Sequence, residues 1–382
     1  MPIMRRAMTQ TARFGFAVLF LAAALMPFGA TLARDMPDPG IDQLIEQLGL
    51  RAAKAPVSER AGWSKPERVI VRGDAEQVDA LGPFAPGVEL VPAPTLEDAV
   101  AAAAGADAVI GFCAEALLDA GADIRWLQLP YAGAERCVSI PAVAERDILV
   151  TNAQRIYGPE IAEHVLAMML SLTRGLHLYA EAQGRGVWER ELIPEDKLWE
   201  LEGKTLLVVG LGGIGTEVAR LGHAMGMRVT ATRNSSRSGP GFVDYVGLAD
   251  ELPKLTSEAD IVVNATPLTP QTRGLFDAGY FESMKPAAYF INVGRGPSVV
   301  TSDLIEALEA GRIAGAGLDV TDPEPLPEGH PLWKAPNVII TPHISALSDL
   351  RSGRLWRVMA ENLRRYTAGE PMLSVVDVRR GY

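Results

Sequence analysis

Three observations in the sequence predict an α/β protein with parallel β-sheets. Short apolar segments typical of strands, such as "RVIVRG", "DAVIGFC", "WLQLP" and "ILVTN", alternate with helical segments such as "LEDAVAAAAGA". A second series follows, consisting of "TLLVVG", "RVTAT", "DIVVNA", "YFINVG", "GAGLDV" and "NVIITP". Between the two series, a long amphipathic helix is predicted with Ile161, Val165, Met168 and Leu172 on one face. Strands that alternate with helices are the signature of parallel sheets joined by crossovers.

The amino-acid composition limits the kinds of molecule that this chain could bind. The chain has 382 residues, of which 48% are hydrophobic, enough for two domains with full cores. Its formal net charge of −11 argues against a nucleic-acid partner, because phosphate backbones bind basic surfaces. Cys113 and Cys137 are the only cysteines, too few for a disulfide framework and without zinc-site spacing. We therefore expect two buried thiols and no metal.

The first 33 residues resemble an export segment. Arg5, Arg6 and Arg13 precede an uncharged run over residues 14–32, and small residues follow in "GATLA". The arginine pair matches only in part the signal that exports folded, cofactor-loaded proteins. We expect a periplasmic protein, or one that the uncleaved segment anchors in a membrane. A cytoplasmic protein whose start is placed too early is the alternative. Residues 34–66, rich in Pro and Ser, are predicted to be a linker.

The most specific motif opens the second strand series. "TLLVVGLGGIGTEVARLGHAMG" combines an apolar strand, the pattern Gly210-x-Gly212-x-x-Gly215 and a helix. Glycines there allow a tight turn and close approach to a pyrophosphate, whose charge lies at the free amides of the helix N-terminus. The motif alone is weak, but the flanking strand and helix predict a Rossmann-type dinucleotide site. Its backbone would comprise Gly210, Gly212, Gly213, Ile214 and Gly215.

The next strand ends in arginine where such folds usually carry an acid. That acid accepts hydrogen bonds from the adenosine ribose, about 20 residues after the glycines. Here Arg233 takes its place, and "TRNSSRS" contains no acid. Arg233, Ser235 and Arg237, together with Ser236, suit a 2′-phosphate, so the sequence predicts NADP in preference to NAD. The alternative is a solvated Arg233 in a permissive site.

Three further residues stand just beyond predicted strand ends, where open α/β sheets form their binding crevice. Arg295 lies in "INVGRG", Glu324 in "LDVTDPEP" and His343 in "NVIITPHIS". A guanidinium can bind the carboxylate and carbonyl oxygens of a 2-oxo acid and polarise the carbonyl. An imidazole can donate the proton, and a carboxylate can favour its charged form. The other four histidines are expected to be structural.

These motifs, in this order, resemble the D-isomer-specific 2-hydroxyacid dehydrogenase family over roughly residues 67–382. The resemblance implies Arg295, Glu324 and His343 as catalytic residues. It places the substrate carboxylate at the amides of Ala132 and Gly133, although Glu135-Arg136 stands where the family often has an aspartate. It also implies further residues that line the cofactor: Thr266, Pro267, Thr272, Val293 and Asp319.

The resemblance also implies the domain arrangement. A smaller flavodoxin-like substrate domain would be discontinuous, with residues 67–156 and 347–382 on either side of an NAD(P)-binding domain over residues 157–346. The family usually forms homodimers, and residues 184–203 resemble the arm that reaches the neighbour. Trp188 would line the neighbour's pocket or be an exposed loop aromatic.

Two functions follow from the resemblance. The favoured one is reduction of a small 2-oxo acid, such as glyoxylate or hydroxypyruvate, to a D-2-hydroxy acid with NADPH. The alternative is a nucleotide-sensing binding protein on the same fold, as in the family's corepressor branch, which retains the catalytic residues.

Overall fold

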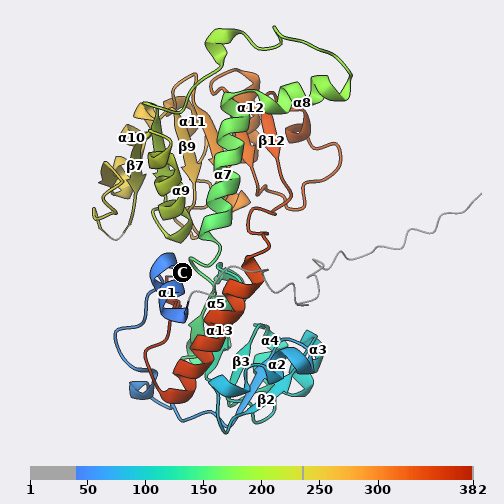
Figure 1. Cartoon of the computed structure of the whole chain (residues 1–382), viewed down its shortest axis with the longest axis vertical. Helices are drawn as coiled ribbons and strands as arrows, with labels where there is room; N and C mark the ends of the chain where they lie inside the picture. The colour runs from blue at the N-terminus through green and yellow to red at the C-terminus, as the bar shows by residue number, and fades with distance from the viewer. Residues whose placement is uncertain (1–39, 235, 381–382) are drawn as a thin grey trace, which may run out of the picture.

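The computed structural model describes residues 40–234 and 236–380, so the predicted export segment and Ser235 lie outside the described residues. It contains two parallel β-sheets, one in each of two domains (Figure 1). Within the described ranges, no helix combines the length and apolar character needed to cross a membrane.

The smaller domain holds the five-stranded sheet in the order β2-β1-β3-β4-β5, which is the flavodoxin-like order. Its strands are β1 (Arg68–Val71), β2 (Glu89–Pro92), β3 (Ala108–Ile110), β4 (Trp126–Gln128) and β5 (Leu149–Thr151). Its helices are α2 (Ala75–Asp79), α3 (Leu96–Ala101), α4 (Glu115–Ala120), α5 (Glu135–Val138) and α6 (Pro141–Glu145).

The C-terminal helix α13 (Arg351–Ala368) returns to this domain. Tyr366 of α13 stacks on Trp126 of β4, with ring centroids 4.6 Å apart. Asn362 of the same helix donates a hydrogen bond of 2.7 Å to buried Gln128. These contacts confirm that the smaller domain is discontinuous in sequence.

Residues 40–66 are not the linker that the sequence predicted. They form α1 (Ile41–Leu48) and the 3-10 turn η1 (Val57–Glu59), and Leu44, Leu50 and Val57 are buried. The Ala53 amide donates to the Met372 carbonyl at 2.8 Å. The Pro and Ser content of this segment suggested a tether. Its three buried apolar side chains instead pack it against the smaller domain.

The larger domain holds a seven-stranded sheet in the order β12-β11-β10-β9-β6-β7-β8, the Rossmann order with one added strand. Its strands are β6 (Thr205–Val209), β7 (Arg228–Thr232), β8 (Tyr245–Gly247), β9 (Ile261–Asn264), β10 (Tyr289–Asn292), β11 (Gly315–Leu318) and β12 (Val338–Ile340). Its helices include α9 (Gly213–Ala224), α10 (Leu252–Glu258), α11 (Ala278–Ser283) and α12 (Thr301–Glu309).

The predicted long helix is α7 (Gly158–Thr173), followed by α8 (Leu176–Gly184). All four residues of its predicted apolar face are buried, namely Ile161, Val165, Met168 and Leu172. Near its start, Glu160 accepts a hydrogen bond of 2.9 Å from Arg354 of α13. This contact joins the beginning of the larger domain to the C-terminal helix of the smaller one.

The expectation of two thiols is wrong. Cys113 and Cys137 form a disulfide, with their Cα atoms 5.7 Å apart. Cys113 follows β3, and Cys137 lies in α5, directly after the segment that carries Gly133. Counting cysteines could not reveal this pair, because the fold brings together residues 24 positions apart. Among the described residues, no group of His, Cys, Asp and Glu is arranged to hold a metal ion.

Candidate active site

The glycine motif forms the predicted turn between β6 and α9. Gly210 has a left-handed φ of +96°, and a Cβ there would lie 3.0 Å from the Ala265 carbonyl oxygen. A Cβ at Gly215 would overlap the Gly210 carbonyl oxygen. Gly212 caps α9, and Gly213 and Ile214 form its first turn. Both tight positions therefore require glycine, and the free amides at the start of α9 suit an anion.

Arg233 follows β7 directly and is partly buried. Its backbone amide donates to the Gly247 carbonyl at 3.0 Å, and Nη1 donates to the Ser238 carbonyl at 2.8 Å. Burial lowers the pKa of Arg233, and repulsion from Arg51 adds to this effect. The guanidinium thus lies just beyond the carboxyl end of β7 and, among the described residues, makes no ion pair.

Arg237 is engaged differently. It forms an ion pair with Glu251, and its Nη1 donates to the Tyr245 hydroxyl at 3.1 Å. Hydrogen bonds from Tyr245 and the Leu248 amide, together with Arg237, lower the pKa of Glu251 to about 2. The sequence showed no acid in this segment, but the fold supplies Glu251 from the turn after β8. Arg237 is therefore already paired with an acid, whereas the Arg233 side chain donates to the Ser238 carbonyl.

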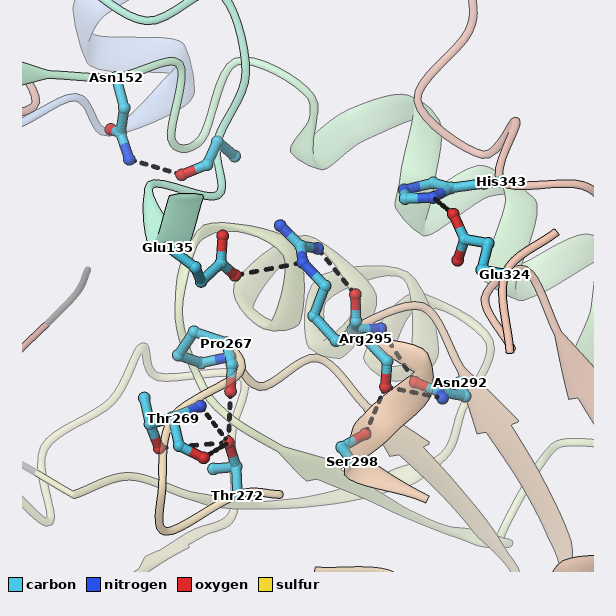
Figure 2. A network of polar contacts seen from close by, with 12 residues as sticks. Glu135, Asn152, Pro267, Thr269, Thr272, Asn292, Arg295, Ser298, Glu324 and His343 are labelled. Atoms are coloured by element: carbon cyan, nitrogen blue, oxygen red, sulfur yellow. Dashed lines mark hydrogen bonds and ion pairs between the residues drawn. The ribbon is translucent and has the colours of Figure 1, made fainter. Parts of the chain in front are cut away.

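The loop after β9 is closed by its own hydrogen bonds (Figure 2). The Thr272 hydroxyl donates to the Pro267 carbonyl at 2.6 Å and accepts from the Thr269 amide at 2.8 Å. Thr266 donates its amide to the Asn264 side chain at 3.0 Å, and the Asn264 carbonyl accepts from the Val293 amide. These bonds give the predicted cofactor-lining loop a fixed shape beside the glycine turn.

Glu324 and His343 come together as predicted. They follow β11 and β12, and Nδ1 of His343 lies 2.6 Å from Oε1 of Glu324. Both side chains are about half-exposed, at 47% and 42%. The hydrogen bond to Glu324 raises the pKa of His343, against the effect of burial, and the same bond lowers the pKa of Glu324. The pair thus favours a charged imidazole.

Asp319 positions the histidine loop. Its buried carboxylate accepts hydrogen bonds from the Thr341 hydroxyl at 2.7 Å and from the Ile344 and Ser345 amides at 2.9 and 3.1 Å. Burial would raise the pKa of Asp319, but hydrogen bonds from Ser345 and Thr341 outweigh it and lower the pKa. His164 Nε2 lies 2.9 Å from the Thr341 hydroxyl. His164 therefore supports this loop, consistent with its expected structural role.

Arg295 extends from the larger domain toward the smaller one (Figure 2). Its Nε lies 3.2 Å from Oε1 of Glu135, and its Nη1 donates to the Gly294 carbonyl at 2.8 Å. A Cβ at Gly133 would overlap Nη2 of Arg295, so glycine is needed for this approach. The Ala132 carbonyl accepts a hydrogen bond of 2.6 Å from the side-chain amide of Asn152. The structure thus brings Ala132, Gly133 and Arg295 to one place.

Two residues in this place were not among the predicted site residues. Glu135 was noted only as a departure from a family pattern, and it contacts Arg295. Asn152 is buried and fixes the backbone that carries Ala132. Its position at the end of β5, in "VTN", was the available signal, because parallel strands end at the binding edge of the sheet.

The arrangement suits hydride transfer to a carbonyl. A dinucleotide bound at the glycine turn would lie along the carboxyl ends of the larger sheet. Arg295 and the Gly133 segment offer donors for a carboxylate and a carbonyl oxygen, and His343 offers a proton. The fold and the site together define a dinucleotide-dependent dehydrogenase of carboxylic acid substrates.

Comparison with known proteins identifies the family. The profile described as "D-isomer specific 2-hydroxyacid dehydrogenase, NAD binding domain" matches residues 166–345. The human glyoxylate reductase/hydroxypyruvate reductase is 32% identical over 292 residues, which is 75% of this chain and 88% of the human protein. The chain belongs to the D-isomer specific 2-hydroxyacid dehydrogenase family and is an NAD(P)-dependent oxidoreductase acting on CH–OH donors.

Solved structures of related proteins support the same family assignment. A D-isomer specific 2-hydroxyacid dehydrogenase family protein from Aeromonas salmonicida has a TM-score of 0.71 and 32% identity, covering 82% of this chain and 100% of that one. An NADPH-dependent glyoxylate/hydroxypyruvate reductase from Sinorhizobium meliloti, solved with NADP and sulfate, has a TM-score of 0.71 and 29% identity, covering 83% and 100%.

Proposed function

We propose that this protein reduces a small 2-oxo acid, such as glyoxylate or hydroxypyruvate, with NADPH as the preferred hydride donor. The observation that carries the proposal is the approach of Arg295, from the larger domain, to Gly133 of the smaller one, near the hydrogen-bonded His343–Glu324 pair. The Gly133 segment and Arg295 would hold the carboxylate and polarise the carbonyl, and His343 would protonate the resulting alkoxide. The nicotinamide supplies the hydride when the cofactor is bound.

The names of the relatives support the choice of substrate. The human protein and the Sinorhizobium meliloti protein are both named for glyoxylate and hydroxypyruvate. The corepressor-like alternative is not favoured, since these relatives are reductases. A small substrate also suits this site, because Glu135 already contacts the Nε edge of the Arg295 guanidinium.

The preference for NADPH rests on Arg233. This residue stands where an NAD site would have an acid, and its guanidinium makes no ion pair among the residues that the structure describes. The Sinorhizobium meliloti relative, at 29% identity, was solved with NADP. Arg237, which the sequence also suggested, would contribute less because Glu251 pairs with it.

We also propose a homodimer formed through the arm after α8. Trp188 is 97% exposed there, and Leu176 and Val187 are exposed as well. Beneath the arm is a cavity of about 450 Å³, whose lining includes Leu172, Ile193 and Trp199. Large apolar side chains in a segment that projects from the domain are suited to a partner surface. Sedimentation equilibrium at micromolar concentration tests this proposal, and a monomer would refute it.

We also propose that the protein is exported. The basic and then apolar order of residues 1–33 supports it, and so does the Cys113–Cys137 disulfide, because disulfides persist mainly in oxidising compartments. Cell fractionation with N-terminal sequencing would test it. A mature protein that begins near Arg34 in the periplasm is expected, whereas an intact Met1 in the cytoplasmic fraction would refute cleavage and export.

One assay tests the activity itself. A panel of 2-oxo acids is incubated with the purified protein and either NADPH or NADH, and cofactor oxidation is followed. We expect turnover of glyoxylate or hydroxypyruvate, faster with NADPH. The His343→Ala variant is the control, with turnover reduced roughly 10²- to 10⁴-fold and cofactor affinity nearly unchanged. Absence of turnover with every acid and both cofactors would favour the nucleotide-sensing alternative.

A further inference from the structure

The disulfide between Cys113 and Cys137 adjoins the place where the two domains meet at Arg295. Cys137 lies in α5, whose first residue is Glu135, and Oε1 of Glu135 is 3.2 Å from Nε of Arg295. The segment before α5 carries Gly133, where a Cβ would overlap Nη2 of Arg295. A covalent bond within the smaller domain is therefore attached to the helix that contacts the arginine of the larger one.

The hydrogen bonds that hold α5 are local. The Cys137 amide donates to the Ala134 carbonyl at 3.0 Å, and both of these side chains are buried. The bond from Asn152 to the Ala132 carbonyl fixes the backbone before the helix, not the helix itself (Figure 2). The disulfide to Cys113, which follows β3, thus ties this four-residue helix directly to the end of a neighbouring strand.

The guanidinium of Arg295 has a different neighbour at each nitrogen. Nη1 donates to the Gly294 carbonyl at 2.8 Å, and Nε faces Glu135 (Figure 2). Nη2 lies at Gly133, and its hydrogens donate to no other residue in the described part of the chain. Glu135 and Gly294 therefore orient the guanidinium so that Nη2 is the donor left for a substrate carboxylate.

We propose that the Cys113–Cys137 disulfide is a redox-sensitive positioning element of the substrate site, which holds Glu135 against Arg295. The proposal rests on the proposed function, the reduction of a 2-oxo acid. When the disulfide is broken, α5 is released from β3, and Glu135 no longer fixes the Nε edge of the guanidinium. Substrate binding then weakens, because charge-assisted hydrogen bonds require aligned donors and small displacements of a positioning group are costly.

The reductant is a dithiol. Cys113 is partly exposed whereas Cys137 is 1% exposed, so a thiolate of the dithiol attacks Sγ of Cys113 and Cys137 leaves. The second thiol of the reductant then displaces Cys113 from the mixed disulfide. The dithiol is oxidised to a disulfide, and the two cysteines together gain two electrons and two protons. An oxidising compartment would keep the site in its closed, binding-competent form.

The test compares the oxidised and reduced forms of the full protein. Calorimetry measures the binding of oxamate, an unreactive analogue of a 2-oxo acid, to protein saturated with NADPH, and fluorescence measures the binding of NADPH itself. Dithiothreitol supplies the dithiol, and a Cys113→Ser/Cys137→Ser double variant mimics the reduced form. Circular dichroism checks that each form is folded.

Variants of Glu135 test the route from the disulfide to the arginine. Glu135→Ala removes the contact with Nε, whereas Glu135→Gln keeps an acceptor there without the charge. The matched control is Glu145→Gln, which removes one exposed negative charge from α6 of the same domain.

We expect reduction to weaken oxamate binding about tenfold and to change NADPH binding less than about twofold, since the glycine turn lies in the other domain. The double variant should match the reduced protein and should not respond to dithiothreitol. Glu135→Ala should cause the same loss in the oxidised protein, and reduction should then add less than about twofold, because both changes act through one contact. Glu135→Gln should lose less than Glu135→Ala, and Glu145→Gln should bind oxamate as the unmodified protein does.

Equal weakening of oxamate and NADPH binding on reduction would show that the disulfide serves stability alone. Tighter oxamate binding by both Glu135→Ala and Glu135→Gln would show that Glu135 competes with the substrate instead of positioning Arg295. If the oxidised protein binds NADPH but neither binds oxamate nor turns over any 2-oxo acid, the proposed function itself fails. If it binds oxamate and reduces a 2-oxo acid equally well in both redox forms, only the role of the disulfide fails.

Discussion

The imidazole of His343 is held by Glu324 through a contact of 2.6 Å between Nδ1 and Oε1. Since Nδ1 is occupied in this way, Nε2 is the ring nitrogen left to transfer a proton to substrate. The carboxylate also raises the pKa of His343. Reduction requires a protonated donor, and the pair keeps that form populated to a higher pH than an isolated histidine would.

Glu324→Gln tests this relationship. The amide can still accept a hydrogen bond but carries no charge, so the pKa of His343 falls toward its ordinary value. Reduction, which needs the protonated imidazole, should then decline at lower pH than in the unmodified enzyme, with about a 10²-fold loss near neutral pH. The measurement is kcat/KM for a 2-oxo acid across pH 5 to 9, with the reverse oxidation as the control. An unmoved pH profile would mean that Glu324 does not set the pKa of the proton donor.

Arg295→Lys tests the binding of the oxo acid. Lysine keeps the positive charge but loses the planar set of donors that can contact Glu135, Gly294 and a substrate together. We expect KM for the 2-oxo acid to rise and kcat to fall, each by at least about tenfold, since one charge-assisted hydrogen bond is worth ~1.5–3 kcal/mol. Cofactor affinity measured by fluorescence should stay constant. Unchanged kinetics would place the substrate elsewhere.

Much of the fold and site was predictable because both depend on local patterns. The glycine spacing, the apolar face of α7 and the positions of Arg295, Glu324 and His343 after strands all follow from short stretches of sequence. The fold then places those strand ends at one edge, as open parallel sheets do.

The features of the fold and site that the sequence did not predict depend on contacts between distant segments. Strands β2 and β8, each at one edge of its sheet, were not singled out. Docking of α1 depends on α13, more than 300 residues away. The pairings of Glu251 with Arg237 and of Glu135 with Arg295 likewise join residues from different loops. The residue pattern within one segment cannot predict a contact with a distant segment.

The disulfide is expected to stabilise the smaller domain. Its two cysteines are 24 residues apart, and closing a loop of this size contributes about 3 kcal/mol, mainly by restricting the unfolded chain. Replacing both Cys113 and Cys137 with serine should lower the free energy of unfolding by that amount in urea titrations. Adding a reductant should destabilise the unmodified protein equally and leave the double variant unchanged. Two free thiols in the native, oxidised protein would contradict the pairing.

Arg233→Asp should reverse the choice of cofactor. The unmodified enzyme is expected to favour NADPH roughly 10- to 1000-fold in kcat/KM, because charge-assisted hydrogen bonds to the 2′-phosphate are partly offset by desolvation and side-chain ordering. Aspartate would accept hydrogen bonds from the ribose hydroxyls of NADH and repel the phosphate. Since Glu251 already pairs with Arg237, Arg237→Gln is the matched control and should reduce the preference much less. Added salt should erode the preference of the unmodified enzyme, because the interaction is ionic. Equal use of NADH and NADPH by that enzyme at low salt would show that Arg233 only tolerates the phosphate.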